Sequence, residues 1–183
     1  MSEPAKTSLD RLFKMTLARH VSEISGQACQ VETLLDTSAI TGQEFALITL
    51  SSSVFKCLNV FHLNHTERAL QMFSSMSSRS VSAFNQTQFR DAFLEFCNMC
   101  CGTMNRELHQ YFPHLGMSTP YFLASDCIPF FRELKPGFEK NYRMTLDSGL
   151  VLHASLYVCD FGLVDFTASY QETTEQTGEL EMF

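Results

Sequence analysis

Basic side chains are scarce in this sequence: 13 Lys and Arg stand against 20 Asp and Glu, which gives a formal net charge of -7. An acidic surface repels phosphate backbones and anionic lipids, which argues against nucleic acids and negatively charged membranes as partners. No apolar run approaches the roughly 20 residues that span a bilayer. The first residues carry mixed charge and lack the apolar segment of a signal peptide. We therefore expect a cytoplasmic protein that binds neither nucleic acid nor membrane.

Tryptophan is also absent, and 17 Phe supply most of the aromatic side chains. Hydrophobic residues make up 45% of the 183 positions, which is enough for one globular domain with a sizeable core. We assign residues 1–160 to this single domain. Residues 161–183 are expected to form the end of a strand followed by an acidic, flexible tail.

The first helix is predicted from apolar residues that recur every three or four positions over residues 7–25. Thr7 or Ser8 would cap its start and Gly26 would end it. His20 falls within or beside the apolar stripe. No other candidate ligand lies near it in the sequence, so we interpret His20 as a partly buried, hydrogen-bonded structural residue.

Two hairpins are predicted from strand-like runs. Residues 44–50 and 54–63 are rich in β-branched and aromatic side chains and are joined by three Ser, which indicates an antiparallel pair. Residues 138–146 and 150–159 flank an Asp-Ser-Gly turn and predict a second pair. The remaining expected elements are a strand over 29–35, a helix over 67–76, a strand over 119–124 and the stretch 130–134, whose type the pattern leaves open. This order of elements predicts an α+β fold in which a mostly antiparallel sheet is covered by long helices.

The longest helix is predicted over residues 86–112, which contain no Pro and one Gly. At about 100° per residue, one broad side is apolar and a narrow stripe opposite is polar. The apolar side consists of Phe89, Phe93, Phe96, Cys97, Cys100, Met104, Leu108 and Tyr111. The polar stripe consists of Gln88, Asp91, Glu95, Asn98, Gly102, Asn105 and His109.

Three positions of this stripe form a candidate site. Glu95 and Asn98 are three residues apart, so their side chains project side by side, and Gly102 leaves the backbone bare one turn further on. A carboxamide offers a donor and an acceptor together, which suits it to orient a water molecule. The alternative is that Glu95 and Asn98 are ordinary solvated residues of an exposed helix face.

The chain has seven Cys, most of them within apolar segments, and buried reduced thiols are the first interpretation. Cys97, Cys100 and Cys101 form a cluster that is also compatible with a metal or redox site. A second pair of ligands at a spacing typical of zinc sites is missing, and neighbouring helical positions diverge in direction.

The stretch DAFLEFCNMCCGTMNREL resembles the helix signature of the CheC/CheX/FliY family of bacterial chemotaxis phosphatases. That signature has an acidic or Ser residue, a Glu four residues later, an Asn three residues after that, and a nearby Gly. Asp91, Glu95, Asn98 and Gly102 match it, and Pro120 matches in kind a Pro that the family places ahead of a strand. The resemblance implies a CheX-like α+β fold.

Two departures from the family pattern refine this resemblance. Thr103 stands where members often carry Asn directly after the motif Gly, and Asn105 comes later. CheC-type proteins have two such helices, whereas one Glu-x-x-Asn motif of this kind is found here, so the chain looks CheX-like. CheX-like proteins pair as homodimers, and an exposed sheet edge would be the physical means.

The resemblance implies an enzyme that removes the phosphoryl group from an aspartate of a CheY-like response regulator. Asn98 would orient the attacking water, and Glu95 would pair with the active-site Lys of the regulator. The chain itself would hold no cofactor, because the Mg²⁺ would belong to the regulator. Gly102 would give clearance to the partner, and Asp91 and Asn105 would be docking contacts.

Two other functions remain open at this point. The same fold could bind a receiver domain or a flagellar component without catalysing phosphate release. A metal-binding sensor built on Cys97, Cys100 and Cys101 is the third interpretation.

Overall fold

The computed structural model describes residues 1–40, 42–76 and 84–169. The helices in this part of the chain are α1 (Glu3–Ser25), α2 (Glu67–Met76) and α3 (Gln86–His109), together with a 3-10 helix, η2, at Ser125–Leu134. The strands are β1 (Cys29–Leu34), β2 (Glu44–Ser51), β3 (Phe55–Leu63), β4 (Gly116–Met117), β5 (Tyr121–Ala124), β6 (Phe138–Leu146) and β7 (Val151–Asp160). No helix among the described residues is long and apolar enough to cross a membrane.

The strands form one antiparallel sheet in the order β1-β6-β7-β3-β2-β4, and β5 also pairs with β2. Both predicted hairpins are confirmed: Leu47 lies opposite Val60 in the first, and Met144 lies opposite Leu152 in the second. Among the described residues, β1 pairs only with β6, so it forms one edge of the sheet. The predicted α+β fold with a mostly antiparallel sheet is confirmed.

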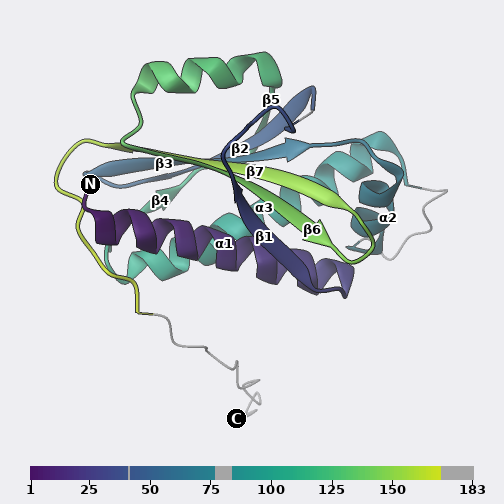
Figure 1. The fold of residues 1–183 in the computed structure, drawn as a ribbon, viewed down its shortest axis with the longest axis horizontal. Coiled ribbons are helices and arrows are strands. Elements are labelled where there is room, and N and C mark those ends of the chain that lie inside the picture. Colours follow the sequence, from purple (N-terminus) through teal and green to yellow (C-terminus); the bar gives the residue numbers. More distant parts are fainter. Residues whose placement is uncertain (41, 77–83, 170–183) are drawn as a thin grey trace, which may run out of the picture.

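The two faces of the sheet are covered differently (Figure 1). Helices α1 and α3 pack against each other and cover one face, where most of the buried apolar side chains lie. The 3-10 helix η2 covers part of the other face, where Phe131 packs on Phe45 and Tyr157. The stretch 130–134, whose type the sequence left open, is therefore the second half of this short helical cover.

The start of α1 was predicted wrongly at Thr7 or Ser8. The helix begins at Glu3, and the side chain of Ser2 caps it by accepting a hydrogen bond from the backbone N–H of Ala5 at 3.2 Å. Pro4 lies in the first turn, where its missing N–H costs nothing. Ser8 is instead buried, and its hydroxyl accepts a bond from the backbone of Ala168. The predicted end is confirmed, because Gly26 adopts a positive φ of 67°.

Residues 161–169 pack onto the helical layer. Val164 and Phe166 are buried, and the backbone N–H of Ser2 donates to the carbonyl oxygen of Val164 at 3.0 Å. The ring of Phe166 lies against Tyr111 and Phe112 at the end of α3. The remainder of the predicted tail, residues 170–183, falls outside the described part of the chain.

Two buried histidines lie opposite each other on β3 and β7, on the face that η2 covers in part. His62 and His153 are cross-strand partners, and both side chains are almost inaccessible to solvent. Burial lowers the pKa of His62 to about 4, and proximity to His153 adds to this. Burial also lowers the pKa of His153. Both rings are therefore neutral near pH 7.

We predict that the free energy of unfolding falls as the pH drops from about 6.5 toward 4. The unfolded chain binds a proton at His62 in this range while the folded chain does not, so acid favours unfolding. A change in the pKa of His62 from 6.5 to about 4 corresponds to roughly 3 kcal/mol. Urea unfolding at several pH values should show a weaker acid sensitivity in His62→Gln than in the wild type.

His65→Gln makes the same substitution at an exposed position and provides the matched control. Equal acid sensitivity in the wild type and in His62→Gln would contradict the prediction.

Candidate functional site on α3

Helix α3 begins with a reciprocal pair of side-chain to backbone hydrogen bonds. The side chain of Asn85 accepts from the backbone N–H of Gln88 at 2.9 Å, and the side chain of Gln88 accepts from the backbone N–H of Asn85 at 3.0 Å. Two of the donors that a helix start leaves unpaired are satisfied in this way. The helix ends at His109, three residues before the predicted end.

The apolar side predicted for α3 faces the core. Phe89, Phe93 and Phe96 are buried, as are Cys97, Cys100, Met104 and Leu108, while Tyr111 beyond the helix is partly exposed. Aromatic contacts fix the rotation of the helix about its axis. Phe73 of α2 contacts Phe89, Phe93 and Phe96 at centroid distances of 5.7, 5.5 and 5.7 Å, and Phe61 of β3 contacts Phe96.

With that side buried, the polar stripe faces outward. Glu95 is exposed and Asn98 is partly exposed. Among the residues that the structure describes, neither side chain has a hydrogen bond or an ion pair. The two groups are one turn apart on the same face of a rigid helix, so both are free to contact another molecule.

Gly102 lies next to them and leaves open space. A Cβ atom built on this glycine would meet no atom within 4 Å, apart from the helix's own backbone. The glycine therefore has no packing role within this chain. It also carries a negative φ in a regular helix, so no turn geometry requires it. The effect of Gly102 is to leave the helix backbone uncovered beside Glu95 and Asn98.

A hydrogen-bonded group lies directly under this surface and joins α3 to α1. His20 Nε2 is 2.9 Å from Thr103 Oγ1, and His20 Nδ1 is 2.9 Å from Glu23 Oε2. Burial lowers the pKa of His20, which Glu23 partly opposes. With the ring neutral, Nδ1–H donates to the Glu23 carboxylate and Nε2 accepts the Thr103 hydroxyl proton. Arg106 donates to the same hydroxyl oxygen at 3.3 Å.

The structural role expected for His20 is thus confirmed in kind: the ring is buried and hydrogen-bonded at both nitrogens. Its partner Thr103 was not singled out for this contact. The sequence could not have paired them, because they are 83 residues apart and no local pattern links them.

The other predicted site residues are distributed along the same stripe. Asp91 is exposed one turn before Glu95. Asn105 is partly exposed, although its side-chain oxygen is buried and has no hydrogen-bond partner among the described residues. His109 is exposed at the end of the helix. Asp91, Glu95, Asn98, Gly102 and Asn105 are therefore brought together by the helix alone.

The sheet edge formed by β4 and β5 runs beside α3. Arg90 donates to Glu44 of β2 at 3.1 Å, and its guanidinium lies 4.3 Å from the ring centroid of Phe122 in β5. The ring of Phe122 also stacks on Phe93. Pro120, which the family resemblance singled out, directly precedes β5. These contacts hold the first half of α3 against the edge of the sheet.

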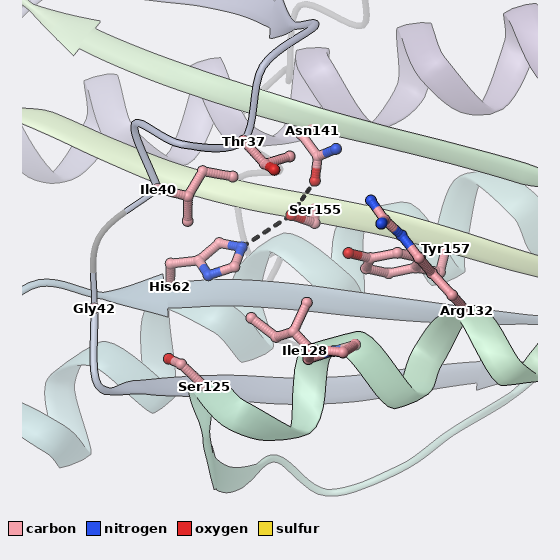
Figure 2. A pocket seen from close by; sticks show the side chains of 11 residues that line it. Thr37, Ile40, Gly42, His62, Ser125, Ile128, Arg132, Asn141, Ser155 and Tyr157 are labelled. Atoms are coloured by element: carbon pink, nitrogen blue, oxygen red, sulfur yellow. Dashed lines mark hydrogen bonds between the residues drawn. The ribbon is translucent and has the colours of Figure 1, made fainter.

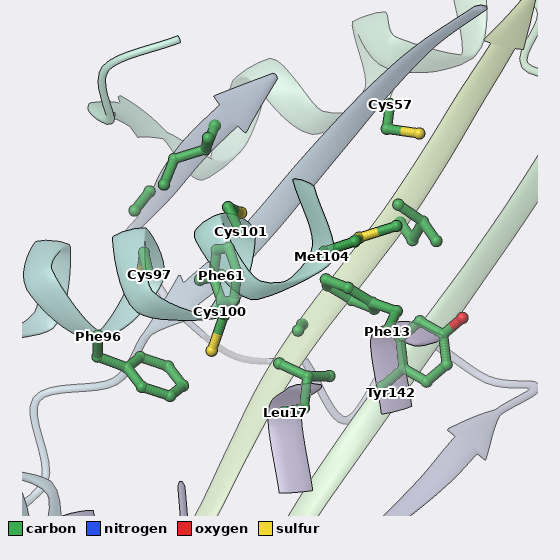
Figure 3. Packing of buried hydrophobic residues seen from close by; sticks show 14 of the residues in the cluster. Phe13, Leu17, Cys57, Phe61, Phe96, Cys97, Cys100, Cys101, Met104 and Tyr142 are labelled. Carbon is green, nitrogen blue, oxygen red and sulfur yellow. The ribbon is translucent and has the colours of Figure 1, made fainter. Parts of the chain in front are cut away.

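The cysteine cluster belongs to the core (Figure 3). Cys97, Cys100 and Cys101 are buried, and their side chains leave α3 in different directions. Burial raises the pKa of all three thiols well above the usual value, so they are protonated near pH 7. The described residues contain no group of three or more His, Cys, Asp or Glu placed to hold a metal ion.

No family model matches the sequence, and no curated protein matches it. Solved structures do match its fold. The chemotaxis protein CheX from Vibrio vulnificus superposes with a TM-score of 0.63 at 14% identity, over 82% of this chain and 98% of that chain. A CheC-like superfamily protein from Shewanella sp. PV-4 gives a TM-score of 0.59 at 14% identity, over 86% and 99%.

A third match is a chain of the CheX-CheY-BeF3-Mg²⁺ complex from Borrelia burgdorferi, with a TM-score of 0.59 at 14% identity, over 81% of this chain and 96% of that chain. The chain therefore has the fold of the CheC, CheX and FliY structures, as the helix motif implied.

We predict that Thr103→Val destabilises the protein by about 1–2 kcal/mol. Valine keeps the β-branched shape but leaves the buried Nε2 of His20 without its donor, which carries a desolvation penalty. Thr87→Val, at an exposed position in the first turn of α3, is the matched control. It should change the free energy of unfolding by less than about 0.5 kcal/mol. Denaturant unfolding measures both, and equal effects at the two positions would contradict the prediction.

Proposed function

From the CheX-like fold and the exposed stripe on α3, we propose that this protein dephosphorylates the phospho-aspartate of a CheY-like response regulator. The observation that carries the proposal is the pair Glu95 and Asn98, unpaired among the described residues, side by side and next to the open backbone at Gly102. A structure of similar fold was solved in complex with CheY, BeF3 and Mg²⁺, which supports a receiver domain as the partner.

An acyl phosphate is already reactive, so the catalyst needs only to place a water molecule in line with the phosphorus and to align the two proteins. Asn98 orients that water through its carboxamide. The oxygen of the water bonds to phosphorus as the bond between phosphorus and the aspartate oxygen breaks. The aspartate of the regulator leaves as a carboxylate, and both protons of the water stay on the released inorganic phosphate. Glu95 pairs with the active-site Lys of the regulator, and the regulator supplies the Mg²⁺ that neutralises the phosphoryl oxygens.

The geometry of α3 agrees with this division of labour. The stripe is convex, and the described residues place no nucleophile with an adjacent base on it. Asp91 and Asn105 extend the contact surface before and after the central pair. Gly102 lets the loop of the partner approach the helix backbone.

We predict that Asn98→Ala and Glu95→Ala each slow phosphate release from a phosphorylated receiver domain by about 100-fold, the size of effect expected when a reacting group loses its alignment. Both side chains lack partners within the described chain, so stability should be unchanged within about 0.5 kcal/mol. Phosphate release measured with phosphorylated receiver domains from the same genome tests this.

Glu67→Ala and Gln71→Ala on α2 provide matched controls, because both positions are exposed and lie outside the stripe. The proposal fails if Asn98→Ala and Glu95→Ala clear phosphate at the wild-type rate. Tight binding of the phosphorylated receiver without faster release by the wild type would instead identify a non-catalytic binding module.

One departure from the family pattern affects the contact surface under either function. Thr103 replaces the Asn that family members often carry after the motif Gly, and its hydroxyl is bonded to His20 and Arg106. It is therefore not available to a partner. The contact surface depends correspondingly more on Glu95 and Asn98, and the two functions separate in the same phosphate-release assay.

Gly102→Ala should have opposite effects on stability and on phosphate release. Alanine in a helix is more stable than glycine by roughly 0.5–1 kcal/mol, and nothing in this chain opposes the added methyl group. We predict a more stable protein whose phosphate release is slower because the methyl group obstructs the partner. Thermal unfolding and the release assay measure the two effects, and an equally active Gly102→Ala would show that the glycine gives no clearance.

A further inference from the structure

A cavity lined by both polar and apolar side chains lies on the opposite face of the sheet from α3 (Figure 2). Its volume is about 290 Å³, and it is open to solvent on one side and bounded by the sheet, by η2 and by residues of the connection between β1 and β2. Strand residues His62, Asn141, Ser155 and Tyr157 form its floor. The proposed phosphatase function makes no use of this cavity.

The floor is a chain of hydrogen bonds with a fixed direction. Ser155 donates to Asn141 Oδ1 at 2.7 Å, and His62 Nε2 lies 2.9 Å from the hydroxyl oxygen of Ser155. The single hydroxyl proton of Ser155 is used toward Asn141, so His62 Nε2–H is the donor to Ser155. The amide nitrogen of Asn141 is then left with its two N–H groups, and it points away from Ser155 (Figure 2).

The rest of the lining adds further donors and one positive charge. The hydroxyl oxygen of Ser125 is buried and has no hydrogen-bond partner among the described residues. Thr37 and Tyr157 contribute hydroxyl groups, and Arg132 extends from η2 on the side where Tyr157 lies. None of the described lining residues is acidic, although the chain has 20 Asp and Glu against 13 Lys and Arg.

The guanidinium of Arg132 has only a long ion-pair contact within the described part of the chain. Its contact with Glu139 is 3.5 Å long, and about two thirds of its side chain, 68%, is exposed. A charge-assisted hydrogen bond between guanidinium and carboxylate is shorter, about 2.7–2.9 Å. An anionic ligand can therefore bind this guanidinium in competition with Glu139.

The apolar part of the lining limits the size and shape of a ligand. Ile128 and Pro129 of η2 and Ile40 of the β1–β2 connection form hydrophobic walls. At about 30 Å³ for each water-sized group, the cavity holds a molecule of roughly ten non-hydrogen atoms. One guanidinium suits the two oxygens of a carboxylate, whereas a phosphate dianion would need more positive charge in a protein of net charge -7.

We propose that this cavity binds a small aliphatic carboxylate, with its carboxylate group on Arg132 and the amide of Asn141 and its hydrocarbon part between Ile40 and Ile128. The ligand lies across the sheet from Glu95 and Asn98, so its binding does not require the phosphatase function.

The test uses the full chain labelled with ¹⁵N and titrated with butyrate, butyramide and inorganic phosphate. Butyrate should give saturable shifts at the side-chain amide of Asn141 and at the backbone of Ser125. Butyramide has the same shape without the charge and should bind at least about tenfold more weakly, since it loses the charge-assisted bond.

Arg132→Gln should weaken butyrate binding by about tenfold for the same reason, and Arg132→Lys should weaken it less. Arg132 is largely exposed, so neither substitution should unfold the protein. Arg11→Gln makes the same change of charge at an exposed position on α1, on the far side of the sheet, and should leave the affinity unchanged.

Four outcomes would overturn the proposal. They are the absence of saturable shifts with butyrate, equal binding of butyramide, equal affinity in Arg132→Gln, and saturation by phosphate in place of butyrate. The last would assign the cavity to a different class of anion. Because phosphate release is not measured, failure here leaves the proposed phosphatase function unaffected.

Discussion

The packing of the aromatic side of α3 is the constraint on which the rest of the structure depends. Phe73 of α2 contacts three rings of α3, and Phe122 of β5 stacks on Phe93 from the edge of the sheet. Removal of one such buried ring typically costs about 3–5 kcal/mol, far more than any single polar contact on the helix. These rings set the rotation of α3, and that rotation decides which side chains reach the surface. The exposure of Glu95 and Asn98 is a consequence of it.

The same helix is held from beneath by polar contacts. The bond between His20 and Thr103 ties α3 to α1 one residue after Gly102, and Arg90 ties its first half to β2 through Glu44. A site that consists of two side chains on a helix has no loop to adjust it. The positions of its two side chains depend on how rigidly the helix is held. The contacts on both sides of the stripe provide this rigidity.

Much of this could be predicted from the sequence because the signals are local. The period of Phe and Cys along residues 86–112 placed the buried side of α3, and the short polar connections placed both hairpins. The start of α1 was missed because Thr7 and Ser8 are as good as Ser2 as caps when only local chemistry is considered. Ser8 is instead needed by Ala168, 160 residues away.

The features on the opposite face of the sheet could not be predicted, because they also depend on contacts between residues that are far apart in the sequence. The hydrogen-bonded chain of His62, Ser155 and Asn141 joins three strands, and its members are up to 93 residues apart. In the sequence they look like isolated polar residues within strands. The 3-10 helix that covers them contains Pro129, which obscures any regular period.

The sheet thus separates two surfaces of different chemistry. An acidic and amide-bearing stripe lies on the outer side of α3, and a half-open cavity lined by hydrogen-bonding and apolar side chains lies on the other face of the sheet. The fold is that of the CheC, CheX and FliY structures, and the stripe is the surface from which we infer contact with a receiver domain.

The most direct test of this account is the footprint of a phosphorylated receiver domain on the ¹⁵N-labelled protein. The account predicts that the backbone signals of Glu95, Asn98 and Gly102 shift or broaden, together with those of Asp91 and Asn105, while the signals of η2 remain unchanged. A footprint on η2 with unperturbed signals along α3 would contradict it.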